Sequence, residues 1–148
     1  SDVCSSDLRC AVLVRYEINL SGMLKKGADI WLNTPRVTRE ASGTSGMTAA
    51  MNGAVNFSIN DGWHVEFQKH GVNSYTIFQD GGTDTVIQDE EDNFNLLKIL
   101  EEEIIPTYYG EPMNWLEIVK NSMSDISPYF DTGRMANEYY EKLYKYNC

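Results

Sequence analysis

Small and hydroxyl-bearing residues gather in one stretch of the chain, residues 40–47, which reads Glu-Ala-Ser-Gly-Thr-Ser-Gly-Met. Gly43 and Gly46 remove side chains where a ligand would approach the backbone. Three hydroxyl side chains accompany them: Ser42, Thr44 and Ser45. If a helix starts here, its unpaired N–H groups and positive dipole end favour an anion such as phosphate. A plain N-cap cluster has the same composition, and a Gly-x-x-Gly spacing does not decide between the two.

The residues around this stretch predict a strand–turn–helix–strand unit. The apolar run 28–32 is short enough for a buried strand, residues 48–53 indicate a helix that stops at a glycine, and residues 54–59 indicate a second strand. In such a βαβ crossover the turn lies outside the carboxyl end of a strand, where α/β sheets bind ligands. A strand at 11–14 and a helix at 18–26 would form a preceding unit. We therefore predict a parallel sheet covered by helices on both faces.

The domain organisation follows from these elements. Residues 10–148 are expected to form part of one domain, with a βαβ sheet region over 10–79 and a helical region over 88–146. Residues 1–9 show no structural period and are interpreted as a non-native or disordered leader. The chain lacks an initiator methionine and begins within a sheet pattern, which suggests a piece of a larger enzyme.

The second half of the chain predicts two more strands and then helices. Residues 64–68 and 74–78 are expected as strands, and the composition of residues 80–84 is typical of a loop. The acidic run 89–92 would lie in the first turn of a helix, where the dipole favours negative charge, and Pro106 would lie at its end.

Two further helix starts are expected in the C-terminal region. Asn114 and Glu117 are spaced as a capping box, and Asp131 or Thr132 would cap the last helix. The apolar stripes of these helices are interpreted as core positions. The run 101–103 of three glutamates is interpreted as a solvated face rather than a metal site.

Composition excludes several classes of function. The net charge of −10 argues against a nucleic-acid partner, because phosphate backbones are bound through an excess of lysine and arginine. No run approaches the roughly 18 apolar residues of a membrane span. Three cysteines make neither a disulfide framework nor a zinc spacing, and no targeting peptide is evident, so we expect a cytoplasmic protein. His64 and His70 are not spaced as metal ligands and are expected to be structural or exposed.

Four motifs resemble those of the alpha-glucan phosphorylases, the family that acts on glycogen, starch and maltodextrin. They are residues 31–36 (Trp-Leu-Asn-Thr-Pro-Arg), 40–47, 51–53 (Met-Asn-Gly) and 61–63 (Asp-Gly-Trp). The match has the family's order and spacing from about Tyr16 to the last helix and is closest to the bacterial branch. Its most specific part is the Glu-Ala-Ser-Gly-Thr block at the start of the second motif.

This resemblance implies a fold and a reaction. The fold class would be α/β, part of the C-terminal Rossmann-like domain of a GT-B glycosyltransferase, with a parallel sheet followed by C-terminal helices. Family members cleave α-1,4-glucan ends with inorganic phosphate and release glucose 1-phosphate. Pyridoxal phosphate assists there through its phosphate group, as proton donor or relay. The implied partners are an α-1,4-glucan and phosphate. The resemblance is also compatible with a homodimer of the full-length protein. The segment alone would be inactive because half of the cleft is absent.

The resemblance also assigns roles by position. The residues that would hold the hydroxyls of the transferred glucosyl unit are Glu40, Ala41, Ser42 and Gly43. Thr44 and Ser45 would lie at the cofactor phosphate, and Tyr16 matches a family tyrosine near the cofactor. Thr48 stands where the family has the lysine that forms a Schiff base with pyridoxal phosphate. Because a hydroxyl cannot form an imine with the aldehyde, covalent attachment of the cofactor is not expected.

Two alternatives remain open beside the phosphorylase. A nucleotide-sugar-dependent glucosyltransferase of the glycogen synthase type has a similar element at this turn and needs no pyridoxal phosphate, which agrees with Thr48. A non-catalytic glucan-binding paralogue would also tolerate the loss of the lysine.

Overall fold

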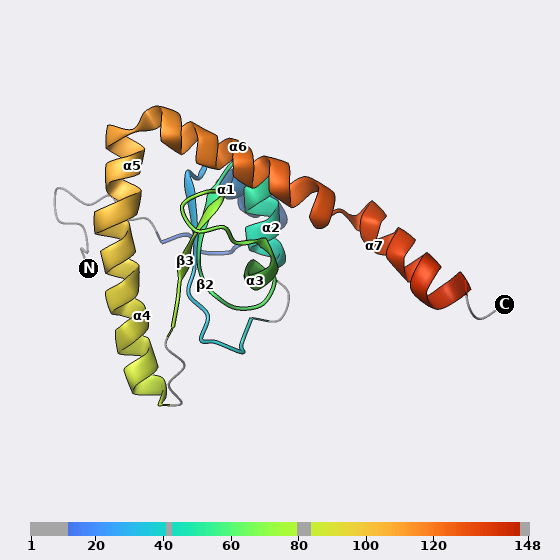
Figure 1. The fold of residues 1–148 in the computed structure, drawn as a ribbon, viewed down its shortest axis with the longest axis horizontal. Coiled ribbons are helices and arrows are strands. Elements are labelled where there is room, and N and C mark those ends of the chain that lie inside the picture. The colour runs from blue at the N-terminus through green and yellow to red at the C-terminus, as the bar shows by residue number, and fades with distance from the viewer. Residues whose placement is uncertain (1–11, 41–42, 80–83, 146–148) are drawn as a thin grey trace.

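The computed structural model describes residues 12–40, 43–79 and 84–145, which form a small parallel sheet with helices packed around it (Figure 1). The sheet and its connections span α1 (Ile18–Gly27), β1 (Ile30–Asn33), α2 (Thr44–Met51), β2 (Val55–Ile59), α3 (His64–Phe67) and β3 (Ser74–Ile77). The C-terminal elements are α4 (Thr85–Ile99), the π-helical segment η1 (Leu100–Ile104), α5 (Ile105–Gly110), α6 (Pro112–Tyr129), α7 (Thr132–Tyr139) and the π-helical segment η2 (Tyr140–Tyr144). The α/β class with a parallel sheet is therefore confirmed.

The strands lie in the order β1-β2-β3, and both pairs are parallel. In the register of the sheet, Leu32 lies beside Phe57, which lies beside Tyr75. The predicted strands at 28–32, 54–59 and 74–78 are present, as is the helix predicted at 18–26. The two crossovers pass through α2 and α3, so the stretch 40–47 follows the carboxyl end of β1, as predicted.

Two predicted strands are wrong. Val12, Leu13 and Val14 form no strand and are exposed, because no neighbouring strand in the described chain supplies hydrogen bonds to their backbone. Residues 64–68 contain the helical turn α3 instead of a strand. The three-residue spacing of His64 and Phe67 places both on one side of a single helical turn, and both side chains are buried there.

The two faces of the sheet differ in chemistry. Along β2, the side chains of Val55, Phe57 and Ile59 join one apolar cluster. Residues of η1 and α6 complete that cluster: Ile104, Trp115 and Ile118. Because successive strand residues point to opposite faces, Asn56 and Ser58 lie on the other face, beneath α2, and both are buried. On this face, buried polar side chains of β2 lie beneath α2.

The C-terminal helices correct three predictions about helix ends. α4, η1 and α5 follow one another as one column (Figure 1), with Pro106 inside the column at the start of α5 rather than at its end. Asp84 caps α4 by accepting from the N–H of Val86, so the acidic run 89–92 lies beyond the first turn. The capping box at Asn114 does not form, because α6 already begins at Pro112.

The last helix is capped as predicted but is not packed as predicted. Asp131 accepts hydrogen bonds from the N–H groups of Gly133 and Arg134, at 2.7 and 3.2 Å. Beyond this cap α7 leads away from the sheet (Figure 1). The apolar side chains that were expected in the core are exposed: Met135, Tyr139, Tyr140, Leu143 and Tyr144. The stripe exists, but its side chains are 47 to 64% exposed and so do not form part of the core. None of the described helices is long and apolar enough to cross a membrane.

Candidate functional site

The turn at 40–47 leads directly into α2, which begins at Thr44. Gly43 precedes the helix in the left-handed conformation with φ 68°, a conformation that glycine adopts without strain. No side chain among the described residues caps this helix start. Thr44 is exposed and Ser45 is half-buried. The first turn of α2 therefore offers backbone N–H groups and two hydroxyls to an anion rather than to a side-chain cap.

The two glycines of the turn make room for the ring of Trp63, whereas the sequence predicted that they make room for a ligand. A Cβ atom on Gly43 would overlap Cδ1 of the indole, and a Cβ atom on Gly46 would lie 2.7 Å from its Cζ2. The space left by the missing side chains is filled by this ring, not kept open for a ligand. Trp63 appeared in the sequence only as part of the motif 61–63, with no contact to the turn assigned to it.

The two residues before Trp63 hold the other end of the turn. The backbone N–H of Glu40 donates to Oδ2 of Asp61 at 3.0 Å. Gly62 has φ 55°, and a Cβ atom there would lie 2.9 Å from Cγ of Glu40. The motif 61–63 thus contacts the turn at Glu40, Gly43 and Gly46. Two of the predicted sugar-binding residues, Ala41 and Ser42, lie outside the described residues.

A buried side chain beneath α2 also forms a hydrogen bond with the first turn of that helix. Asn56 is fully buried in β2 and donates from Nδ2 to the carbonyl of Gly46 at 3.0 Å. Its Oδ1 has no hydrogen-bond partner among the described residues, and the same is true of Oδ1 of Asn60 at the carboxyl end of β2. Neither asparagine was singled out from the sequence, because an isolated asparagine in a strand carries no signal of such a contact.

Thr48 directs its hydroxyl back onto its own helix. Oγ1 donates to the carbonyls of Thr44 and Ser45, at 2.8 and 3.1 Å. Threonine side chains commonly make this bond inside helices. The residue is exposed on α2, so a longer side chain would fit there. In this chain the position presents no amine.

Tyr16 and Arg36 make their polar contacts elsewhere. The hydroxyl of Tyr16 donates to Ser21 of α1 rather than to Thr44 or Ser45, and the tyrosine is 62% exposed. Arg36, from the motif 31–36, pairs with Asp89 of α4, with Nε 2.9 Å from Oδ1. The structure therefore brings the helix start and motif 61–63 together but adds neither of these side chains to them through hydrogen bonds.

Both histidines have structural surroundings, as expected. His64 is buried with Nε2 at 3.0 Å from Oγ1 of Thr76, while its Nδ1 has no partner among the described residues. His70 accepts the N–H of Thr76 on Nδ1 and lies 2.8 Å from Glu103 through Nε2. The described residues contain no group of three or more metal-ligating side chains.

The burial of His64 predicts a pH-dependent stability. Burial of the ring, with His70 nearby, lowers the pKa of His64 from 6.5 to about 4. Between these two values the unfolded chain binds more protons than the folded one, so the free energy of unfolding falls as the pH falls. We expect this group to remove about 2 kcal/mol between pH 7.5 and pH 5. Urea unfolding of the intact protein at both pH values should show a smaller loss in His64→Gln. Equal losses in the two proteins would contradict the assignment.

Comparison with known proteins identifies the family. Residues 2–105 match the carbohydrate phosphorylase family. The chain is 41% identical over 137 residues to a maltodextrin phosphorylase from Thermococcus litoralis and 38% identical over 143 residues to a glycogen phosphorylase from Aquifex aeolicus. It is also 47% identical over 135 residues to an uncharacterized protein from Methanocaldococcus jannaschii.

These matches cover 90 to 92% of this chain but only 16, 20 and 25% of the Thermococcus, Aquifex and Methanocaldococcus proteins, respectively. The chain thus corresponds to a small part of each relative. The match to the family extends over α1, the whole sheet and α4, and it includes the turn and the motif that holds it. This chain belongs to the carbohydrate phosphorylase family.

Proposed function

We propose that this chain is part of an alpha-glucan phosphorylase, which transfers glucosyl units from the ends of α-1,4-glucans to inorganic phosphate and yields glucose 1-phosphate. The observation that carries the proposal is the uncapped start of α2, which follows the Glu40–Gly43 turn in a chain of the carbohydrate phosphorylase family. Relatives named maltodextrin phosphorylase and glycogen phosphorylase support the choice of an α-glucan as substrate.

The turn would bind the sugar, and the helix start would bind a phosphate group. The glucosyl hydroxyls would be held by Glu40, Ala41, Ser42 and Gly43. The carboxylate of Glu40 can accept hydrogen bonds from sugar hydroxyls. Its backbone is already fixed by Asp61. Thr44 and Ser45, with the first N–H groups of α2, would bind a phosphate group, and Tyr16 would lie near the cofactor.

The residues suit one part of pyridoxal phosphate and not another. Uncapped N–H groups and two hydroxyls at a helix start are suited to its phosphate group. Thr48 offers no amine for a covalent bond to its aldehyde, and its hydroxyl is engaged by backbone carbonyls. We infer that the cofactor would be held without a covalent bond, and that it would supply a proton donor or relay through its phosphate.

The wider architecture belongs to the same proposal. The parallel sheet with its C-terminal helices would be part of the second Rossmann-like domain of a GT-B enzyme, and another domain would close the sugar cleft. The basic groups that hold substrate phosphate would lie outside this chain. The net charge of −10 agrees with that division, because this part brings no surplus of cations.

Thr48 favours a second candidate function. A glucosyltransferase of the glycogen synthase type uses a nucleotide sugar and needs no amine at this position. A non-catalytic glucan-binding paralogue would tolerate threonine there as well. The three functions differ in the products that they form.

One assay on the intact protein separates them. With maltoheptaose and orthophosphate, we expect release of glucose 1-phosphate. Extension of maltoheptaose by ADP-glucose or UDP-glucose, without phosphorolysis, would replace the proposal by the synthase. Retained binding of maltoheptaose with neither reaction would leave the paralogue.

A further inference from the structure

The indole of Trp63 is packed among apolar side chains of the core. Its ring lies 5.0 Å from Phe67 and 5.4 Å from Phe130, measured between centroids, and the pair with Phe130 is edge-to-face. Ala50 and Ile126 complete the cluster around it. The tryptophan is 6% exposed. Because three elements, α2, α3 and α6, enclose the ring, its position is fixed by the core of the domain and not by a ligand.

The same ring also limits the path of the turn. The backbone at Gly43 and Gly46 approaches the indole so closely that neither position has space for a Cβ atom. Asn56 binds the carbonyl of Gly46, and Asp61 binds the N–H of Glu40. The turn is therefore fixed at its beginning, at the left-handed glycine and in the first turn of α2. The ring supports two of these three points.

We propose that Trp63 is a positioning residue for glucosyl recognition, acting through its contacts with Gly43 and Gly46. The inference rests on the proposed function for its effect on catalysis, but not for its effect on the turn. Trp63 sets where Gly43 and the first N–H groups of α2 lie, while its neighbours Asp61 and Gly62 hold Glu40. In enzymes, a misplacement of binding groups by about 1 Å can reduce the rate by about two orders of magnitude.

The test compares two conservative substitutions in the intact protein. Trp63→Phe keeps an aromatic ring but removes the part of the indole that contacts Gly46. Trp115→Phe is the matched control, because Trp115 is also buried yet packs in the apolar cluster on the other face of the sheet. We expect kcat/KM for phosphorolysis to fall about tenfold or more in Trp63→Phe and less than about twofold in Trp115→Phe. Equal losses in both variants would overturn the proposal, because they would show a general effect of core packing.

A compensation experiment tests the contact itself. Gly46→Ala places a Cβ atom 2.7 Å from Cζ2 of Trp63 and 2.8 Å from Oδ1 of Asn56. We expect this substitution to reduce activity strongly in the natural chain and several-fold less strongly in the Trp63→Phe background, where the clash with the ring is relieved. Losses that simply multiply would show that the two residues act independently.

Hydrogen exchange separates a failure of this inference from a failure of the proposed function. The hydrogen-bonded amides in the first turns of α2, beginning with Met47, whose N–H donates to the carbonyl of Gly43 at 3.2 Å, should exchange faster in Trp63→Phe than in the natural protein and in Trp115→Phe. Faster exchange would support the positioning role even if the natural protein performs no phosphorolysis. The absence of phosphorolysis would overturn the proposed function but not the positioning role. Unchanged exchange at these amides in Trp63→Phe would overturn the positioning role whatever the activity.

Discussion

Replacing Thr48 by lysine in the intact protein should produce a borohydride-reducible adduct with pyridoxal phosphate, whereas the natural chain should yield none on this segment. A lysine amine can form the covalent bond that a hydroxyl cannot. Thr48 is exposed on α2, and its hydroxyl donates to backbone carbonyls of its own helix. Lysine also has a higher helix propensity than threonine. The substitution should therefore change the chemistry of the site with little effect on folding.

The adduct is measured by mass spectrometry of peptides after incubation with pyridoxal phosphate and reduction. Thr48→Gln is the matched control, because it lengthens the side chain without supplying a reactive amine. A stoichiometric reduced adduct on any lysine of this chain in the natural protein would contradict the inference that attachment here is noncovalent. Failure of Thr48→Lys to form an adduct would show that the helix start does not bring the cofactor within reach.

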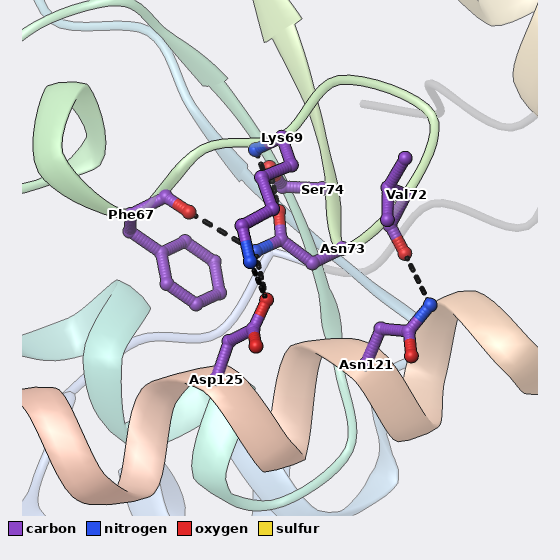
Figure 2. Close-up of polar contacts among 7 residues, drawn as sticks. All are labelled: Phe67, Lys69, Val72, Asn73, Ser74, Asn121 and Asp125. Carbon is purple, nitrogen blue, oxygen red and sulfur yellow. Dashed lines mark hydrogen bonds and ion pairs between the residues drawn. The ribbon is translucent and has the colours of Figure 1, made fainter.

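Removing the side chain of Asn73 should destabilise the connection between α3 and β3 by about 3 kcal/mol. Figure 2 shows why: this fully buried asparagine is the centre of a group of polar contacts that joins the connection to α6. Nδ2 donates to the carbonyl of Phe67 and to Asp125, while Oδ1 accepts from the N–H of Lys69 and the hydroxyl of Ser74. Asn73→Ala leaves several of these groups buried without a partner, each at a cost of about 1–3 kcal/mol before relaxation.

The measurement is the free energy of opening from hydrogen exchange of the β3 amides in the intact protein. Asn121→Ala is the control from the same cluster. Its single bond to the carbonyl of Val72 is exposed, so we expect a loss of about 1 kcal/mol or less. The ion pair of Lys69 with Asp125 is half-exposed and should also contribute little. Similar losses in the two asparagine variants would contradict the central role of Asn73.

The sheet could be predicted because its signals are local. Short apolar runs mark β1, β2 and β3, and Gly53, with φ 93°, ends the helix between the first two. The turn at 40–47 could be placed at the end of a strand for the same reason. The strand predicted at 64–68 failed because five residues are too few to separate alternation from a single helical turn.

The reasons behind the site residues could not be predicted in the same way. A glycine shows that a side chain is missing, but not what occupies the space. Gly43 and Trp63 are twenty positions apart in the sequence, and their contact depends on how α2 and α3 pack over β2. Likewise, the stripe on α7 shows that one face of the helix is apolar, but not that anything covers it. Local patterns predict elements, whereas these contacts depend on the tertiary fold.

The position of β1 at one side of the sheet has a practical consequence. Its outer backbone groups are unpaired within the described chain, and a hollow of about 410 Å³ opens beside it, lined by residues that include Ile30, Ile104 and Tyr108. An uncovered strand of this kind is a template on which further chains can add, and it promotes aggregation. Experiments on an isolated fragment that carries the turn at 40–47 would therefore have to shield this strand, for example with an inward-pointing lysine or a proline at its margin.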